Sequence, residues 1–83
     1  MSKNNTYIKS KECIEFDYTL LIKRIIDMFG SQNNFAIVLG ITNVSLSKKL
    51  NNIVNFTQRE MLMSMKLLNI PLNLLGTYFF TVK

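Results

Sequence analysis

The 83-residue sequence has no histidine and a single cysteine, Cys13. One cysteine excludes a disulfide within the chain, and the lack of histidine excludes a zinc site of the usual Cys/His type. Histidine is also the commonest general acid or base, and no pair of carboxylates on one helical face replaces it here. The sequence contains no glycine-rich phosphate loop. We therefore expect no enzymatic activity, no metal site and no cofactor.

Acidic residues are few and unevenly placed. Five acids stand against ten lysines and arginines, which gives a net charge of +5 and a pI near 9.6. No acid occurs from Met28 to Gln58. A basic chain favours a polyanionic partner, and a surface without carboxylates is what a phosphate backbone requires. Charge alone does not separate nucleic acid from an acidic protein.

Long apolar runs are missing. The longest, such as Phe35–Ile41, are far too short to span a bilayer, and the N-terminus is too polar for a signal peptide. We therefore expect no membrane partner and a location in the reducing cytoplasm. Nearly half of the residues are apolar, which suffices for the core of one small domain.

The first fifteen residues show no helical period, and we interpret residues 1–15 as a flexible N-terminal arm. The arm either lies along a nucleic acid or is an unstructured leader. Residues 16–83 form the predicted domain. Apolar residues there recur at helical spacing. One expected core stripe consists of Leu21, Ile25, Met28 and Phe29, and Phe56 is expected to plug the core. Thr57 and Glu60 have the spacing of a capping box. The predicted helices are Asp17–Phe29 with Asp17 as N-cap, Gln32–Leu39, Asn43–Asn51, a helix from Thr57 to about Leu68, and a short helix from Pro71.

The second and third predicted helices are joined by a tight turn. Gly40 follows the last apolar residue of the first of them, where a left-handed conformation costs glycine little. Thr42 is a good N-cap for the next helix, and Ile41 and Leu46 have hydrophobic-staple spacing around it. Ala36 lies where a larger side chain would push the two helices apart. This order of residues is typical of a helix-turn-helix.

The motif resembles that of the phage repressor and Cro-like family. The residues that carry the resemblance are Gln32, Ala36, Leu39–Gly40–Ile41, Leu46 and Leu50. Over residues 16–80 the chain is more closely similar to small Cro-like regulators of phages of Gram-positive bacteria. The resemblance implies an all-α, five-helix, lambda-repressor-like helix-turn-helix domain. It also implies a transcriptional regulator of a phage or prophage in the host cytoplasm, which binds double-stranded operator DNA and blocks transcription.

The resemblance also implies which residues contact DNA, on the outer face of the helix Asn43–Asn51. Those expected to reach base edges are Asn43, Val44, Ser47 and Lys48, and Ser45 is expected to contact DNA from the same face. Those expected to contact phosphates are Gln32, Thr42, Lys49 and Asn52. The sequence departs from the family in two ways: Asn51–Asn52 replaces an Asn-Gly pair, and the recognition helix lacks arginine. Asparagine tolerates the left-handed region, so the turn at Asn51–Asn52 is expected to be preserved.

A different class of function is the alternative. Some small phage regulators of this fold bind a repressor protein and alter its DNA binding, as an antirepressor or co-repressor. The weakly basic recognition helix and the apolar C-terminus both fit that role.

The C-terminal segment is too apolar for a free tail. Leu72, Leu75 and Phe79 are expected to cover the core. Leu74, Tyr78 and Phe80 are left without an evident partner inside the chain, and an exposed aromatic patch often marks an interface. We therefore predict a homodimer through Leu74, Tyr78 and Phe80. The alternative is that all these residues close the core of a monomer.

Overall fold

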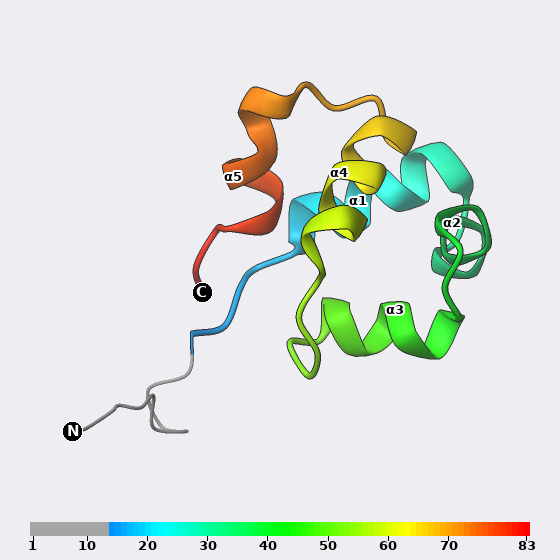
Figure 1. Cartoon of the computed structure of the whole chain (residues 1–83), viewed down its shortest axis with the longest axis horizontal. Coiled ribbons are helices and arrows are strands. Elements are labelled where there is room, and N and C mark those ends of the chain that lie inside the picture. The colour runs from blue at the N-terminus through cyan, green and yellow to red at the C-terminus, as the bar shows by residue number, and fades with distance from the viewer. Residues whose placement is uncertain (1–13) are drawn as a thin grey trace.

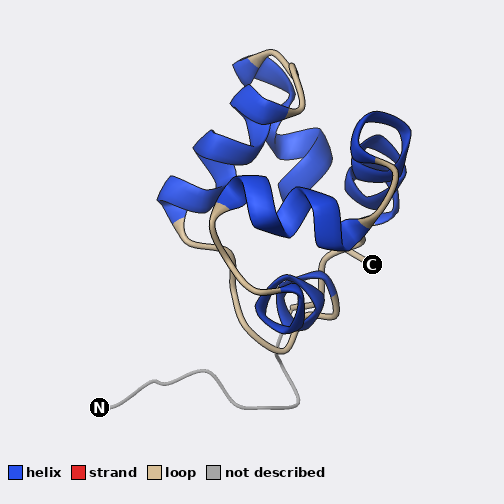
Figure 2. Ribbon diagram, turned by 90° about the vertical axis from the view of Figure 1, so that its right-hand side faces the viewer, coloured by secondary structure: helices blue, strands red, loops and turns tan. Residues whose placement is uncertain are grey.

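A computed structural model describes residues 14–83, which fold into five α-helices joined by short connections (Figures 1 and 2). The helices are α1 (Thr19–Phe29), α2 (Gln32–Leu39), α3 (Asn43–Leu50), α4 (Gln58–Leu67) and α5 (Leu75–Phe79), and the 3-10 turn η2 (Leu72–Leu74) precedes α5. Within residues 14–83 extended pairing is limited to one isolated bridge, between Phe16 and Val82. The all-α prediction is confirmed. Most of the predicted arm, residues 1–13, lies outside the described residues.

Side-chain caps start three of the helices. The hydroxyls of Ser31, Thr42 and Thr57 each accept a hydrogen bond from the backbone N–H three residues on. These caps satisfy N–H groups that have no partner within the helix. The predicted N-cap of the first helix is wrong. Tyr18 is at the N-cap position, and the Asp17 carboxylate instead accepts from the backbone N–H and hydroxyl of Thr19.

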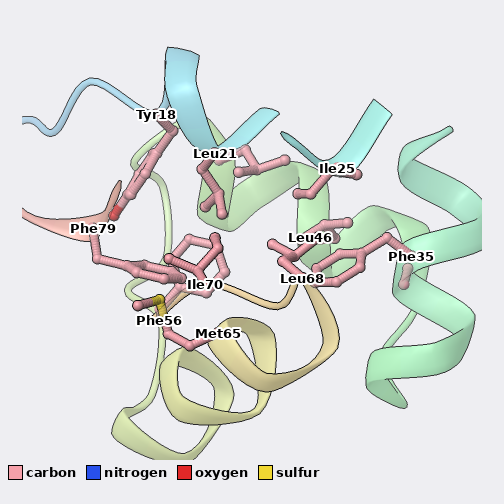
Figure 3. Close-up of a cluster of buried hydrophobic side chains, with 12 residues drawn as sticks. Tyr18, Leu21, Ile25, Phe35, Leu46, Phe56, Met65, Leu68, Ile70 and Phe79 are labelled. Carbon is pink, nitrogen blue, oxygen red and sulfur yellow. The ribbon is translucent and has the colours of Figure 1, made fainter. Parts of the chain in front are cut away.

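The core has an aromatic end and an aliphatic end (Figure 3). The Phe56 ring meets Tyr18 and Phe79 edge-on, with ring centroids 5.3 and 5.2 Å away. Edge-to-face contacts of this kind add to the stabilisation that burial provides. Further along, the core is built mainly of buried aliphatic side chains from α1, α3 and the end of α4, which are Leu21, Ile25, Leu46 and Leu68. Phe35 of α2 is buried at this end and meets the Phe29 ring, with centroids 5.2 Å apart.

Two side chains that we expected in the core are exposed. Met28 lies at the C-terminal end of α1, where Phe29 is the residue that packs against the core, and Leu72 lies in η2. Tyr18 and Ile70, in contrast, are both buried. Local spacing did not identify these two because both lie outside the regular helices.

The two ends of the described chain lie side by side (Figure 1). The Asp17 N–H donates to the Thr81 carbonyl at 2.7 Å, and the Lys83 N–H donates to the Glu15 carbonyl at 3.0 Å. The Phe80 ring meets the Phe16 ring edge-on at 5.8 Å. The C-terminal residues thus close the domain over the segment that leads into α1.

Candidate functional site

The connection between α2 and α3 has the geometry that the sequence predicts. Gly40 is left-handed with a φ of 89°, and its N–H donates to the Ala36 carbonyl at 2.9 Å. The Ile41 N–H donates to the same carbonyl at 3.0 Å. Thr42 then caps α3 by accepting from the Ser45 N–H at 3.0 Å. Ala36 is buried, which allows the two helices to approach closely.

The outer face of α3 contains most of the residues that we expected to read DNA. Asn43, Val44 and Lys48 are exposed, while Ser45 and Ser47 are partly buried. Gln32, in the first turn of α2, is also partly buried. This surface is therefore accessible to a macromolecular partner.

Lys49 does not belong to that surface. Its side chain is almost completely buried, and its ammonium group lies 3.0 Å from the Glu60 carboxylate at the start of α4. The same group donates to the Asn55 carbonyl at 3.2 Å. The assignment of Lys49 to a DNA phosphate is therefore corrected, because an ammonium group that is paired inside the fold is not available to an external anion.

Asn52 also has an internal role. Its side-chain oxygen accepts from the Phe16 N–H at 2.8 Å, and its amide nitrogen donates to the Phe16 carbonyl at 2.9 Å. The backbone φ of Asn52 is 64°, so the predicted left-handed turn is present. The phosphate contact expected of Asn52 is corrected, because both polar atoms of its side chain are hydrogen-bonded to the Phe16 backbone. The Thr42 hydroxyl accepts from the Ser45 N–H in the helix cap, and as an exposed hydroxyl it can still donate its own hydrogen.

The surface around the turn is unexpectedly apolar. Ile37 is 67% exposed and Val44 is 64% exposed, and Val38 is exposed as well. We call Ile37, Val38 and Val44 the turn patch. The sequence did not identify Ile37 and Val38, since they lie in a continuous apolar run in which periodicity does not separate the inner from the outer face. With Lys49 buried, Lys48 is the one cation of residues 32–50 that faces solvent.

The described residues hold neither a cluster of metal ligands nor a membrane-spanning helix. Within residues 14–83 no three His, Cys, Asp or Glu side chains gather where they could hold a metal ion. No helix in the same range has the length and apolar character needed to cross a membrane.

Comparison with known families gives a match along the whole domain. Residues 14–82 match the model of DUF739, a family described as proteins of unknown function. The chain belongs to this family. No curated protein matches the chain.

A solved structure gives this DUF739 member a characterised relative. The chain is similar to the modulator of repression (MOR) of the temperate bacteriophage TP901-1 from Lactococcus lactis. The two are 34% identical in sequence and superpose with a TM-score of 0.70, over 78% of this chain and 88% of the modulator. The predicted resemblance to a phage regulator is therefore confirmed, whereas membership of a Cro or repressor family is not, because the family that matches is one of unknown function.

The match corrects the expected function. A Cro-like repressor that blocks transcription by occupying operator DNA was the main prediction, and it is wrong. The relative is named for modulating repression, not for repression itself, which favours the alternative role. In addition, two of the residues expected to contact DNA, Lys49 and Asn52, make contacts within the fold.

The structure gives two of the three predicted dimer residues partners within the chain. Phe80 packs edge-on against Phe16, and Tyr78 packs against the buried core. Leu74 remains partly exposed. These contacts supply the intramolecular partners that the sequence did not reveal. The homodimer stays a prediction, which light scattering at micromolar concentration would test.

Proposed function

We propose that this protein is a phage or prophage modulator of repression that acts by binding a repressor protein in the host cytoplasm. It is a binding protein, and no catalytic step is part of this role. The turn patch carries the proposal, because three large aliphatic side chains are exposed there beside a single solvent-facing lysine. Such a surface suits the apolar core of a protein interface better than it suits phosphates.

Two further observations support a protein partner. Several large apolar side chains exposed around one turn of a small domain are a common mark of an interaction site. The TP901-1 modulator has the same fold at 34% identity, and its name assigns it to the control of repression. The turn between α2 and α3 is fixed by caps and by backbone hydrogen bonds, so the patch is presented with little ordering cost on binding.

The test is titration of the purified protein against the purified repressor of the phage that carries this gene, with affinity measured by calorimetry. We expect a complex at micromolar or lower concentration. Gel retardation of operator DNA by the repressor should change when the protein is added, and the sign of the change separates an antirepressor from a co-repressor. Absence of a complex would overturn the proposal.

A matched pair of variants tests the turn patch. Val44→Lys places a charge in the patch, and Val82→Lys makes the same change at another exposed valine near the C-terminus. We expect Val44→Lys to weaken repressor binding at least about tenfold, as for an interface hot spot, and Val82→Lys to bind as the wild type does. Equal affinities for the two variants would exclude the turn patch from the interface.

A further inference from the structure

A second apolar surface lies on the outer side of α4, the helix drawn in yellow in Figure 1. Leu62 and Met63 are 48% and 47% exposed there, and Leu72 is 62% exposed. Together with Met65 and Ile70 they line an open groove of about 620 Å³. We call this the α4 groove. Its apolar residues are absent from the turn patch, so the two surfaces can be altered independently.

The sequence of α4 explains why the groove is apolar. Met65 and Leu68 lie on the face that packs into the core. On the outer side, residues at positions i, i+3, i+4 and i+7 are neighbours, and here they read Arg59, Leu62, Met63 and Lys66. Two apolar side chains are therefore bracketed by two cations. A solvated helix face would have polar residues in the middle positions.

The opposite wall is held in place by backbone geometry. α4 ends in a Schellman motif, in which the Ile70 N–H donates to the Met65 carbonyl at 2.9 Å and Asn69 is left-handed with a φ of 55°. The Arg24 side chain then donates to the carbonyls of Leu68 and Asn69 at 3.1 and 3.2 Å. The groove is thus preformed, which reduces the entropy that a partner loses on docking.

The charges specify the occupant. Arg59 and Lys66 form no ion pair within residues 14–83, and they lie two helical turns apart, about 10 Å along the axis. An apolar segment with acidic residues about two turns apart would complement both. A second copy of the chain docked symmetrically on this groove would bring Arg59 and Lys66 of both copies together. Like-charge repulsion among these four cations disfavours such a dimer.

From these observations we infer that the α4 groove binds an amphipathic helix of the repressor, with its apolar face on Leu62 and Met63 and acidic residues at Arg59 and Lys66. Grooves of this kind take helices whose apolar anchors follow the i, i+3, i+4 pattern. Methionine side chains adapt to the shape of such a partner. This inference rests on the proposed function, since it names a second contact with the same repressor.

Charge reversal tests the electrostatic half of the inference. We expect the double variant Arg59→Glu/Lys66→Glu to bind the purified repressor at least tenfold more weakly than the wild type at low salt. We also expect that difference to shrink at high salt. The control is Lys23→Glu, which reverses an exposed charge on α1. Thermal melting confirms that each variant is folded.

Methyl spectroscopy tests the location. In protein labelled with ¹³C at the methionine methyl groups, addition of unlabelled repressor should shift the Met63 and Met65 resonances. Met28, exposed on α1, should stay in place. The groove inference would be overturned if the wild type and the double variant bound the repressor with equal affinity and the Met63 and Met65 signals did not move. The proposed function would then remain intact. Failure of the wild type to bind would overturn both.

Discussion

Lys49 and Glu60 form an ion pair that ties the end of α3 to the start of α4. The Lys49 ammonium lies 3.0 Å from Oε1 of Glu60, and the same oxygen accepts from the Thr57 N–H at 2.8 Å. The Thr57 hydroxyl in turn accepts from the Glu60 N–H at 3.0 Å. One carboxylate therefore completes both a capping box and an interhelical ion pair. The loop between the helices is fixed from both ends by this arrangement.

Removal of the Lys49 side chain should destabilise the domain. Lys49→Ala leaves the mostly buried Glu60 carboxylate without its cation, and we expect the free energy of unfolding to fall by about 2–3 kcal/mol. Lys48→Ala is the matched control, because Lys48 is exposed and the change should be within about 0.5 kcal/mol. Urea unfolding followed by circular dichroism measures both. Similar losses for the two variants would contradict the internal role of Lys49.

The pair should also make stability depend on pH. Burial acts to raise the pKa of Glu60, but the hydrogen bonds from Thr57 and the contact with Lys49 outweigh it, so the pKa lies below its ordinary value of 4.5. The unfolded chain therefore takes up the proton at a higher pH than the folded chain does. The stabilisation is fully present above about pH 4.5 and is lost as the pH falls through the lowered pKa of the folded state.

Glu60→Gln isolates this contribution. The variant should be less stable than the wild type at neutral pH, because Lys49 loses its counter-charge. The difference should begin to narrow as the pH falls below about 4.5 and should close as the pH falls through the lowered pKa of the wild-type carboxyl. Melting temperatures of both proteins from pH 7 to pH 3 provide the measurement. A gap that stays constant over this range would show that the charge of Glu60 is not what stabilises the fold.

Local signals in the sequence predicted the local structure well. Gly40 and Thr42 form the turn and cap that their residue types predict, and Thr57 and Glu60 form the predicted capping box. Each of these features depends on residues three or four positions apart, so the chemistry of the side chains is sufficient. Phe56 was also expected to plug the core, and it is buried.

The roles of Lys49 and Asn52 could not be predicted from the sequence because they depend on residues far away along the chain. Lys48 and Lys49 are adjacent and chemically identical, but Lys49 lies on the inward face of α3, where Glu60, eleven residues on, supplies the counter-charge that allows its burial. Asn52 was expected to favour a left-handed turn, but its pairing with Phe16 spans 36 residues. The function was misjudged for a related reason: a helix-turn-helix pattern specifies the turn, but it does not specify which partner the surface around the turn suits.

Substitution of Ser64, unlike the substitutions above, is expected not to lower the stability of the domain. Its hydroxyl is buried in α4 and has no hydrogen-bond partner within the described part of the chain. An unsatisfied buried hydroxyl is unfavourable, and alanine has the higher helix propensity. We therefore expect Ser64→Ala to leave the free energy of unfolding unchanged or to raise it by up to about 1 kcal/mol. Chemical denaturation measures this. The contrasting variant is Thr57→Ala, which removes a helix cap and should lower the free energy of unfolding by about 1 kcal/mol. A clear loss in Ser64→Ala would mean that the hydroxyl has a partner.

Asn52 combines a backbone requirement with a side-chain requirement, and two substitutions separate them. Asn52→Gly keeps the left-handed φ of 64° accessible but removes both hydrogen bonds to Phe16, and we expect a loss of about 1–2 kcal/mol. Asn52→Ala removes the same bonds and also forces a non-glycine residue without a polar side chain into that conformation, which adds about 1 kcal/mol.

Hydrogen exchange gives the Asn52 variants an independent readout. In both of them the Phe16 amide should exchange faster than in the wild type, because its acceptor is gone, while the Ile25 amide inside α1 should follow global unfolding. Since Phe16 packs on Phe80, loosening of this segment should extend to the paired C-terminal residues. Equal stabilities for the glycine and alanine variants would show that the left-handed backbone at position 52 does not destabilise the alanine variant. An unchanged Phe16 amide would show that the side chain of Asn52 does not hold the two ends of the domain to α3.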